Sequence, residues 1–144
     1  MNNVNITKAR ESDIDTLMKW GNETPEIWLN DEFKWYPERS MVTDLVKSDR
    51  AIFLVARIDD KPVGMCLCHN LIVWGYCDSL FVAKEFRGEG IATQLIKEAE
   101  KRLKSAGVKL MALHMITTNK VATEVYRKLG FIPGVKVQFY EKRI

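Results

Sequence analysis

The sequence has no long apolar segment, and its longest uninterrupted apolar run covers only residues 51–56. A helix that crosses a membrane needs about 20 such residues. Residues 1–8 also lack the apolar core of a secretion signal. We therefore expect no membrane partner and a cytoplasmic location.

Cysteine is scarce and odd in number, with three in 144 residues, which argues against a disulfide framework. Cys66 and Cys68 lie two apart on a predicted strand and so share a face, and Cys77 lies on the next strand. No fourth ligand stands at a spacing that suits zinc. We expect no metal and three cysteines buried as small apolar residues.

No charge of one sign dominates the chain, since 22 Lys and Arg against 19 Asp and Glu give a net charge of +3. The basic residues alternate with acids or sit at predicted helix ends, without the dense basic stripe of a nucleic-acid binder. A mild positive charge suits an anionic small molecule. The length and the 47% apolar content predict one domain over residues 1–144.

Hydrophobic periodicity and turn residues predict the order β-α-α-β-β-β-α-β-α-β-β. The predicted strands cover residues 4–9, 51–58, 63–69, 76–82 and 108–115, a short stretch near Phe131, and residues 135–142. The predicted helices are one capped by Ser12, one over 38–47, one over 91–106 and one capped by Asn119. This order predicts an α/β (α+β mixed) fold: a central, mixed, mostly antiparallel twisted sheet of six to seven strands with helices on both faces.

The most informative stretch joins the strand that ends near Val82 to the helix that begins near Ile91. Two glycines lie in the turn between them, and no Ser, Thr, Asp or Asn caps the helix. The first amide groups of the helix are then free to bind an anion such as a pyrophosphate. The alternative is a tight turn without a ligand, in which Glu89 could itself satisfy the helix dipole.

Two familiar phosphate loops do not fit this turn. Ile91 and Ala92 follow Gly90 where a P-loop has Lys and Ser or Thr, and Thr93 replaces the last small residue of a dinucleotide fingerprint. The spacing Arg87-x-x-Gly90-x-Ala92 instead resembles the acyl-CoA signature of the GCN5-related N-acetyltransferase (GNAT) family. Asn119, residues 122–131 and the order of elements extend this resemblance over almost the whole chain, although residues before 50 match only in outline.

The resemblance implies acetyl-CoA as the cofactor. It places the pyrophosphate on a run of seven residues, which are Arg87, Gly88, Glu89, Gly90, Ile91, Ala92 and Thr93. It places the pantetheine arm beside Leu80, Phe81 and Val82, and adds contacts from Asn119 and Tyr126.

The same resemblance implies that Tyr126 is the general acid that protonates the departing thiolate. His114 and Asp78 are the candidate proton acceptors, and a chain of water molecules is an alternative to both. Two of these residues also have a structural alternative. Tyr126 could be a core residue, and His114 could be a polar residue on an alternating strand. His69 we expect to serve structure or solvent.

Aromatic residues gather where family members build the acceptor pocket, and Trp28, Trp35 and Tyr36 are the candidate substrate contacts. Cation–π packing would suit an amine there, while the alternative is a loop pinned to the core by these rings. The predicted activity is direct transfer of an acetyl group from acetyl-CoA to a primary amine of a small-molecule or peptide acceptor.

A catalytically silent acyl-CoA-binding module that senses or recruits is one alternative function, and an unrelated α/β binding domain is another. An edge strand over residues 135–142 could also pair two copies into a homodimer.

Overall fold

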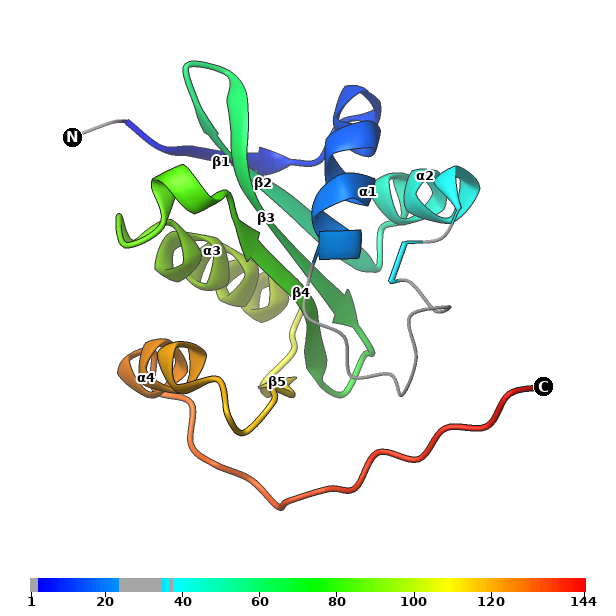
Figure 1. Ribbon diagram of the computed structural model, residues 1–144, viewed down its shortest axis with the longest axis vertical. Coiled ribbons are helices and arrows are strands. Elements are labelled where there is room, and N and C mark those ends of the chain that lie inside the picture. Colours follow the sequence, from blue (N-terminus) through cyan, green and yellow to red (C-terminus); the bar gives the residue numbers. More distant parts are fainter. Residues whose placement is uncertain (1–2, 24–34, 37) are drawn as a thin grey trace.

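The computed structural model describes residues 3–23, 35–36 and 38–144 (Figure 1). Its strands are β1 (Asn5–Lys8), β2 (Ala51–Ile58), β3 (Lys61–Asn70), β4 (Gly75–Val82) and β5 (Met111–Leu113). Its α-helices are α1 (Ile14–Glu23), α2 (Arg39–Lys47), α3 (Ile91–Ser105) and α4 (Lys120–Lys128), with 3₁₀ turns η1 (Glu11–Asp13) and η2 (Lys84–Phe86). In the described ranges, no helix is both long and apolar enough to cross a membrane.

The five described strands form one mixed sheet in the order β1-β2-β3-β4-β5. Neighbours from β1 to β4 run antiparallel, and β5 pairs parallel to β4 after the crossover through α3. The tight β2–β3 turn places Asp59 and Asp60 in the left-handed region, with φ of 49° and 62°. Asp tolerates this conformation better than most residues do.

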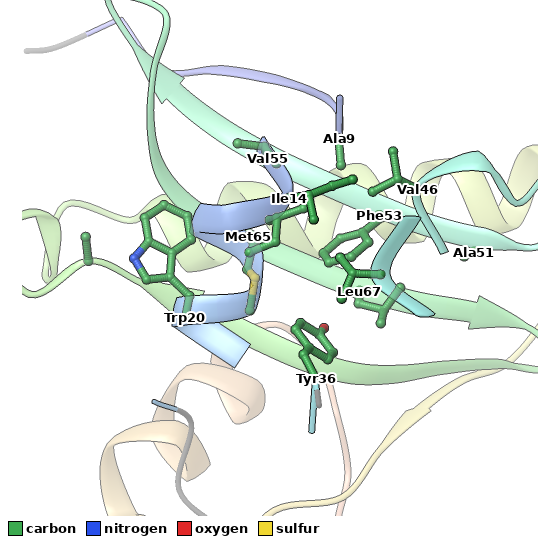
Figure 2. Close-up of a cluster of buried hydrophobic side chains, with 13 residues drawn as sticks. Ala9, Ile14, Trp20, Tyr36, Val46, Ala51, Phe53, Val55, Met65 and Leu67 are labelled. Atoms are coloured by element: carbon green, nitrogen blue, oxygen red, sulfur yellow. The ribbon is translucent and has the colours of Figure 1, made fainter. Parts of the chain in front are cut away.

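One face of the sheet packs against α1 and α2 (Figure 1). Figure 2 shows the core between these layers, where Trp20 of α1 and Tyr36 close over Phe53 and Met65 of the central strands. The central strands read as nearly continuous apolar runs because helices cover both of their faces.

The opposite face packs against α3. The apolar stripe of this helix comprises Ile91, Leu95, Ile96, Ala99 and Leu103, at the helical spacing that the sequence predicts. The helix ends with Gly107 at φ 84°, a position that favours glycine. Burial of both faces fixes the register of β3 and β4, because a slip of one residue would exchange the faces.

The start of α1 differs from the prediction that Ser12 caps it. Ser12 is exposed, and the carboxylate of Asp13 instead accepts the backbone N–H of Arg10 at 2.7 Å. Asp13 is also buried, and it accepts a 2.6 Å hydrogen bond from Nη2 of Arg57 on β2. The local sequence suggests Ser12 because it does not show that Arg57 lies opposite Asp13.

The C-terminal segment also differs from the prediction. Residues 130–144 contain no strand, so the described sheet has five strands instead of six to seven. The predicted strand over 108–115 shortens to β5, which has three residues. A strand needs a partner for its backbone groups, and so short an edge offers few. The alternating residues over 135–142 are therefore not sufficient to add a strand to the sheet. Figure 1 shows the C-terminal segment extended away from β5.

Candidate active site

Strands β4 and β5 diverge soon after they meet. They pair over only three positions, Gly75 with Met111 through Cys77 with Leu113, and β5 ends there. The stretch of β4 over residues 78–82 therefore has β3 on one side and an open edge on the other among the described residues. An extended ligand can bind such an edge through backbone hydrogen bonds, as an added strand does.

The open edge leads to the N-terminus of α3. Gly90 lies at the N-cap with φ 78° and provides no side-chain cap, and Gly88 has φ 84°. The first helical hydrogen bond runs from the amide of Gln94 to the carbonyl of Gly90 at 3.1 Å. The amides of residues 88–93 donate to no described residue, so this helix end can bind an anion.

The carboxylate of Glu89 does not occupy this position. Glu89 is exposed and forms no hydrogen bond with these amides within the described chain. A Cβ atom added to Gly88 or Gly90 would meet nothing within 4 Å, so the space over the backbone is open. The turn therefore lacks an internal group that replaces a ligand.

Arg87 holds the turn against the end of β4. Its Nε donates to the carbonyl of Val82 at 2.9 Å, and its guanidinium carbon lies 5.7 Å from the ring centroid of Phe81. The side chain remains exposed, so its other nitrogen atoms can reach an anion on the turn.

A β-bulge in β4 marks the point where the open edge begins. Leu67 pairs with Ser79, but the next residue, Cys68, pairs with Cys77, so Asp78 is the extra residue. A bulge re-aims side chains locally. It moves Cys77 to the α3 face and leaves Asp78 beside His69, with Oδ2 of Asp78 3.3 Å from Nε2 of His69.

The sequence suggests only a structural or solvent role for His69, and the structure pairs its ring with Asp78. Its ring and the Asp78 carboxylate are both partly buried, with 30% and 18% of the side chains exposed. Nothing in the local sequence indicates the pair, because the bulge brings the two side chains together. Alternation along β3 could show only that His69 shares a face with Leu67.

His114 lies just after β5 and faces aromatic neighbours. Its Nδ1 is hydrogen-bonded to the hydroxyl of Tyr76, and the two rings stack at 5.6 Å with 17° between their planes. The ring of Trp35 lies 6.4 Å from His114, and that of Trp74 lies 5.6 Å from Tyr76. These four residues form one aromatic row, Trp74–Tyr76–His114–Trp35, near the start of the open edge.

Tyr126 projects from α4 toward the α3 face of the sheet. The side-chain oxygen of Asn119 caps this helix by accepting the amide of Ala122 at 3.1 Å, as the sequence predicts. The Tyr126 ring packs edge-on against Phe131 at 5.6 Å. Burial, followed by the nearby thiol of Cys77, raises the pKa of Tyr126 well above its ordinary value. The phenol stays protonated at neutral pH, as an ordinary tyrosine does, and the raised pKa makes it a weaker acid than an exposed one.

The three predicted substrate residues lie in different settings. Trp28 is outside the described residues. Tyr36 is in the core with 1% exposed, and its hydroxyl donates to Oγ of Ser79 at 3.1 Å. The backbone of Tyr36 is also bound on both sides by the amide of Asn22 at 3.1 Å. This placement favours the alternative for Tyr36, a ring pinned to the core, whereas Trp35 lies in the aromatic row.

The profile of the acetyltransferase (GNAT) family matches residues 14–131. The chain belongs to this family. The signature that the sequence resembles is therefore the signature of the chain's own family. This chain also has the open edge of β4 and the uncapped N-terminus of α3.

The relatives include an uncharacterized N-acetyltransferase and one with a named acceptor. An uncharacterized N-acetyltransferase of Methanocaldococcus jannaschii is 33% identical over 111 residues, 72% of this chain and 45% of that protein. Aminoglycoside N(6′)-acetyltransferase type 1 of Salmonella enteritidis is 24% identical over 93% of this chain and 97% of its own. The chain spans about half the length of the first curated relatives that it matches.

A solved structure shares the fold. Aminoglycoside N-acetyltransferase AAC(6′)-Iy in complex with CoA superposes with a TM-score of 0.80 at 19% identity, over 100% of this chain and 97% of that one. At this level of identity the similarity establishes the architecture of the chain.

Proposed function

We propose that this protein transfers an acetyl group from acetyl-CoA to a primary amine by direct transfer in a ternary complex. One observation carries the proposal. The open edge of β4 joins the uncapped N-terminus of α3 at one end and lies near Tyr126 and Asp78 at the other. The arrangement offers a long anionic cofactor a continuous path to groups that can move protons.

The cofactor supplies an activated acetyl thioester, and the chain supplies its binding groups. The amides of residues 88–93 bind the pyrophosphate, with Arg87 adding charge. Residues 78–82 rise by about 3.3 Å each and so offer about 13 Å of open edge for the pantetheine arm. The amide nitrogen of Asn119 is available to the arm, because its oxygen caps α4.

Tyr126 donates the proton that the departing thiolate requires. Its phenol is neutral at physiological pH, as an ordinary tyrosine is, and because burial and Cys77 raise its pKa, the transfer depends on its position beside the thiolate. Its helix begins at the Asn119 cap and contacts the α3 face through Tyr126 and Leu129. Two anchored points fix the direction of the hydroxyl, which general acid catalysis requires.

Asp78 binds the ammonium group of the acceptor and is the first candidate to receive its proton. The carboxylate lies at the bulge where β4 and β5 diverge, and Nε2 of His69 is 3.3 Å away to pass the proton onward. His114 is the second candidate, since its Nδ1 is already engaged by Tyr76 and only Nε2 could act. The aromatic row next to these groups suits a cation.

Two further expectations belong to this proposal. Three free thiols favour a reducing compartment, which supports the cytoplasm as the location.

The exposed side chains of Val135, Val137 and Phe139 stand at alternate positions of an extended segment, which supports a homodimer built by pairing this segment with a second copy. Light scattering of Val137→Lys beside the unchanged protein tests the dimer, and an unchanged mass would refute this role of the segment.

The first experiment measures thermal stability with CoA and acetyl-CoA. A ligand at about 100 times its dissociation constant should add about 2.7 kcal/mol to the free energy of unfolding. The second measures release of free CoA from acetyl-CoA with a panel of primary amines. Binding with no turnover on any amine would indicate the silent acyl-CoA module, and no binding would refute the proposal.

Asp78→Asn tests the acceptor end of the site. We expect a large loss of turnover while stabilisation by CoA is kept, because Asp78 faces the amine. Asp59→Asn in the exposed β2–β3 turn is the matched control, since Asn also tolerates its φ of 49°. Equal turnover in both variants would remove Asp78 from the mechanism.

A further inference from the structure

Three cysteine side chains meet in the core beneath α3. Sγ of Cys66 lies 3.7 Å from Sγ of Cys68 and 3.8 Å from Sγ of Cys77, and all three atoms lie within 4.8 Å of one another. The residues are 0%, 0% and 4% exposed, and none forms a disulfide. We define these three residues as the thiol cluster.

The bulge in β4 builds the thiol cluster. Partners in a regular antiparallel register share a face. Continuing the pairing of Leu67 with Ser79 would place Cys77 opposite His69, on the face that packs against α1 and α2. The extra residue Asp78 moves Cys77 opposite Cys68 and onto the α3 face. Alternation along β3 alone indicates a shared face only for Cys66 and Cys68.

We propose that the thiol cluster is a binding site for a trivalent thiophilic metalloid, for which arsenous acid is the probe. One As(OH)₃ condenses with three S–H groups, so that three As–S bonds form, three As–O bonds break and three water molecules leave. No oxidation state changes, and no proton is released to the solvent. The proposal does not depend on acetyl transfer.

Geometry suits an atom bonded to all three sulfurs. A trivalent atom with a lone pair is pyramidal, and bonds of about 2.3 Å at angles of roughly 100° keep the sulfurs about 3.5 Å apart. The two distances from Cys66 are 3.7 and 3.8 Å, so the free thiols are already near this spacing. The sulfurs of Cys68 and Cys77 are at most 4.8 Å apart, so binding requires only small movements of the three side chains.

Charge selects a trivalent atom over Zn²⁺ or Cu⁺. The cluster lies in a core of apolar residues that includes Leu54, Leu95 and Ala99. A complex of three thiolates with Zn²⁺ or Cu⁺ has a net negative charge, which is costly to bury without a neighbouring cation. The complex of three thiolates with a trivalent atom is neutral.

Entry to the site is from Cys77, the one cluster residue that solvent touches. Cys77 is the last β4 residue paired with β5, at the point where the two strands diverge. Local opening of such a short pairing costs less than global unfolding. Binding should therefore be slow but should not require denaturation.

The test incubates the native protein with arsenite and measures its mass under native conditions. The expected product contains one arsenic per chain and three fewer hydrogens, with the free thiol count falling from three to zero. Cys66→Ala, Cys68→Ala and Cys77→Ala should each bind arsenite at least about tenfold more weakly, because a three-bond site becomes a two-bond site. Val63→Ala, in the same core with all thiols intact, is the control for loosened packing and should bind normally.

Two outcomes would overturn the proposal. One is the absence of an adduct both in the native protein and in protein refolded with arsenite, which removes slow entry as an explanation. The other is unchanged arsenite affinity in any of the three alanine variants. Zn²⁺ titrated in parallel should bind more weakly than arsenite at neutral pH, and the reverse order would also refute the charge argument.

Discussion

Replacement of Gly90 by Ala separates the backbone strain of the α3 turn from its contact with a ligand. Gly90 has φ 78°, where an L side chain costs roughly 1–2 kcal/mol. Nothing lies within 4 Å of the added Cβ, so strain is the only cost to the ligand-free protein. The methyl group would, however, project into the space that a pyrophosphate must approach.

Gly107 offers a matched control at the other end of the same helix. It has φ 84°, and an added Cβ there also meets nothing within 4 Å. Gly107→Ala and Gly90→Ala should therefore lose similar stability, roughly 1–2 kcal/mol each. For a chain of this length, each kcal/mol lowers the melting temperature by about 3–5 °C.

Affinity for CoA should separate the two variants. Loss of one charged hydrogen bond costs about 1.5–3 kcal/mol, which corresponds to a 10- to 100-fold rise in the dissociation constant. We expect this rise for Gly90→Ala and no change for Gly107→Ala, measured by thermal shift over a CoA titration. Equal CoA affinities in the two variants would refute the idea that the α3 amides bind the cofactor.

Three other predictions address the acid, a buried ion pair and pH. Tyr126→Phe should lower turnover by about 100-fold or more with little change in acetyl-CoA binding, and unchanged turnover in a CoA-release assay would remove it as the acid. Asp13→Ala should lose about 3–5 kcal/mol in urea unfolding, because it leaves the buried charge of Arg57 unpaired, and a loss below 1 kcal/mol would contradict this reading. Burial raises the pKa of Tyr36, so above about pH 10 the unfolded chain loses this proton first and stability falls as pH rises. Tyr36→Phe should make that fall shallower in unfolding measured on both sides of pH 10, and an unchanged slope would contradict the buried neutral phenol.

Local signals predicted the elements and the turn before α3. The apolar stripe of α3, its missing cap and the Asn119 cap of α4 each depend on residues close together in the chain. Predictions failed where the deciding partner is distant or absent. The start of α1 depends on Asp13, which is paired with the distant Arg57, and not on Ser12. The strands predicted near Phe131 and over residues 135–142 would need a sheet edge longer than β5.

Periodicity and capping are local properties of the chain, so the mixed sheet between helices, the uncapped α3 turn and the family signature follow from residues that are near neighbours in sequence. The side chains that meet around β4 come from distant segments, so their contacts follow from three-dimensional packing. One extra residue, Asp78, shifts the β3–β4 register, pairs Asp78 with His69 on one face and gathers three thiols on the other. Register depends on how both faces of the sheet are packed, so no local pattern could specify it.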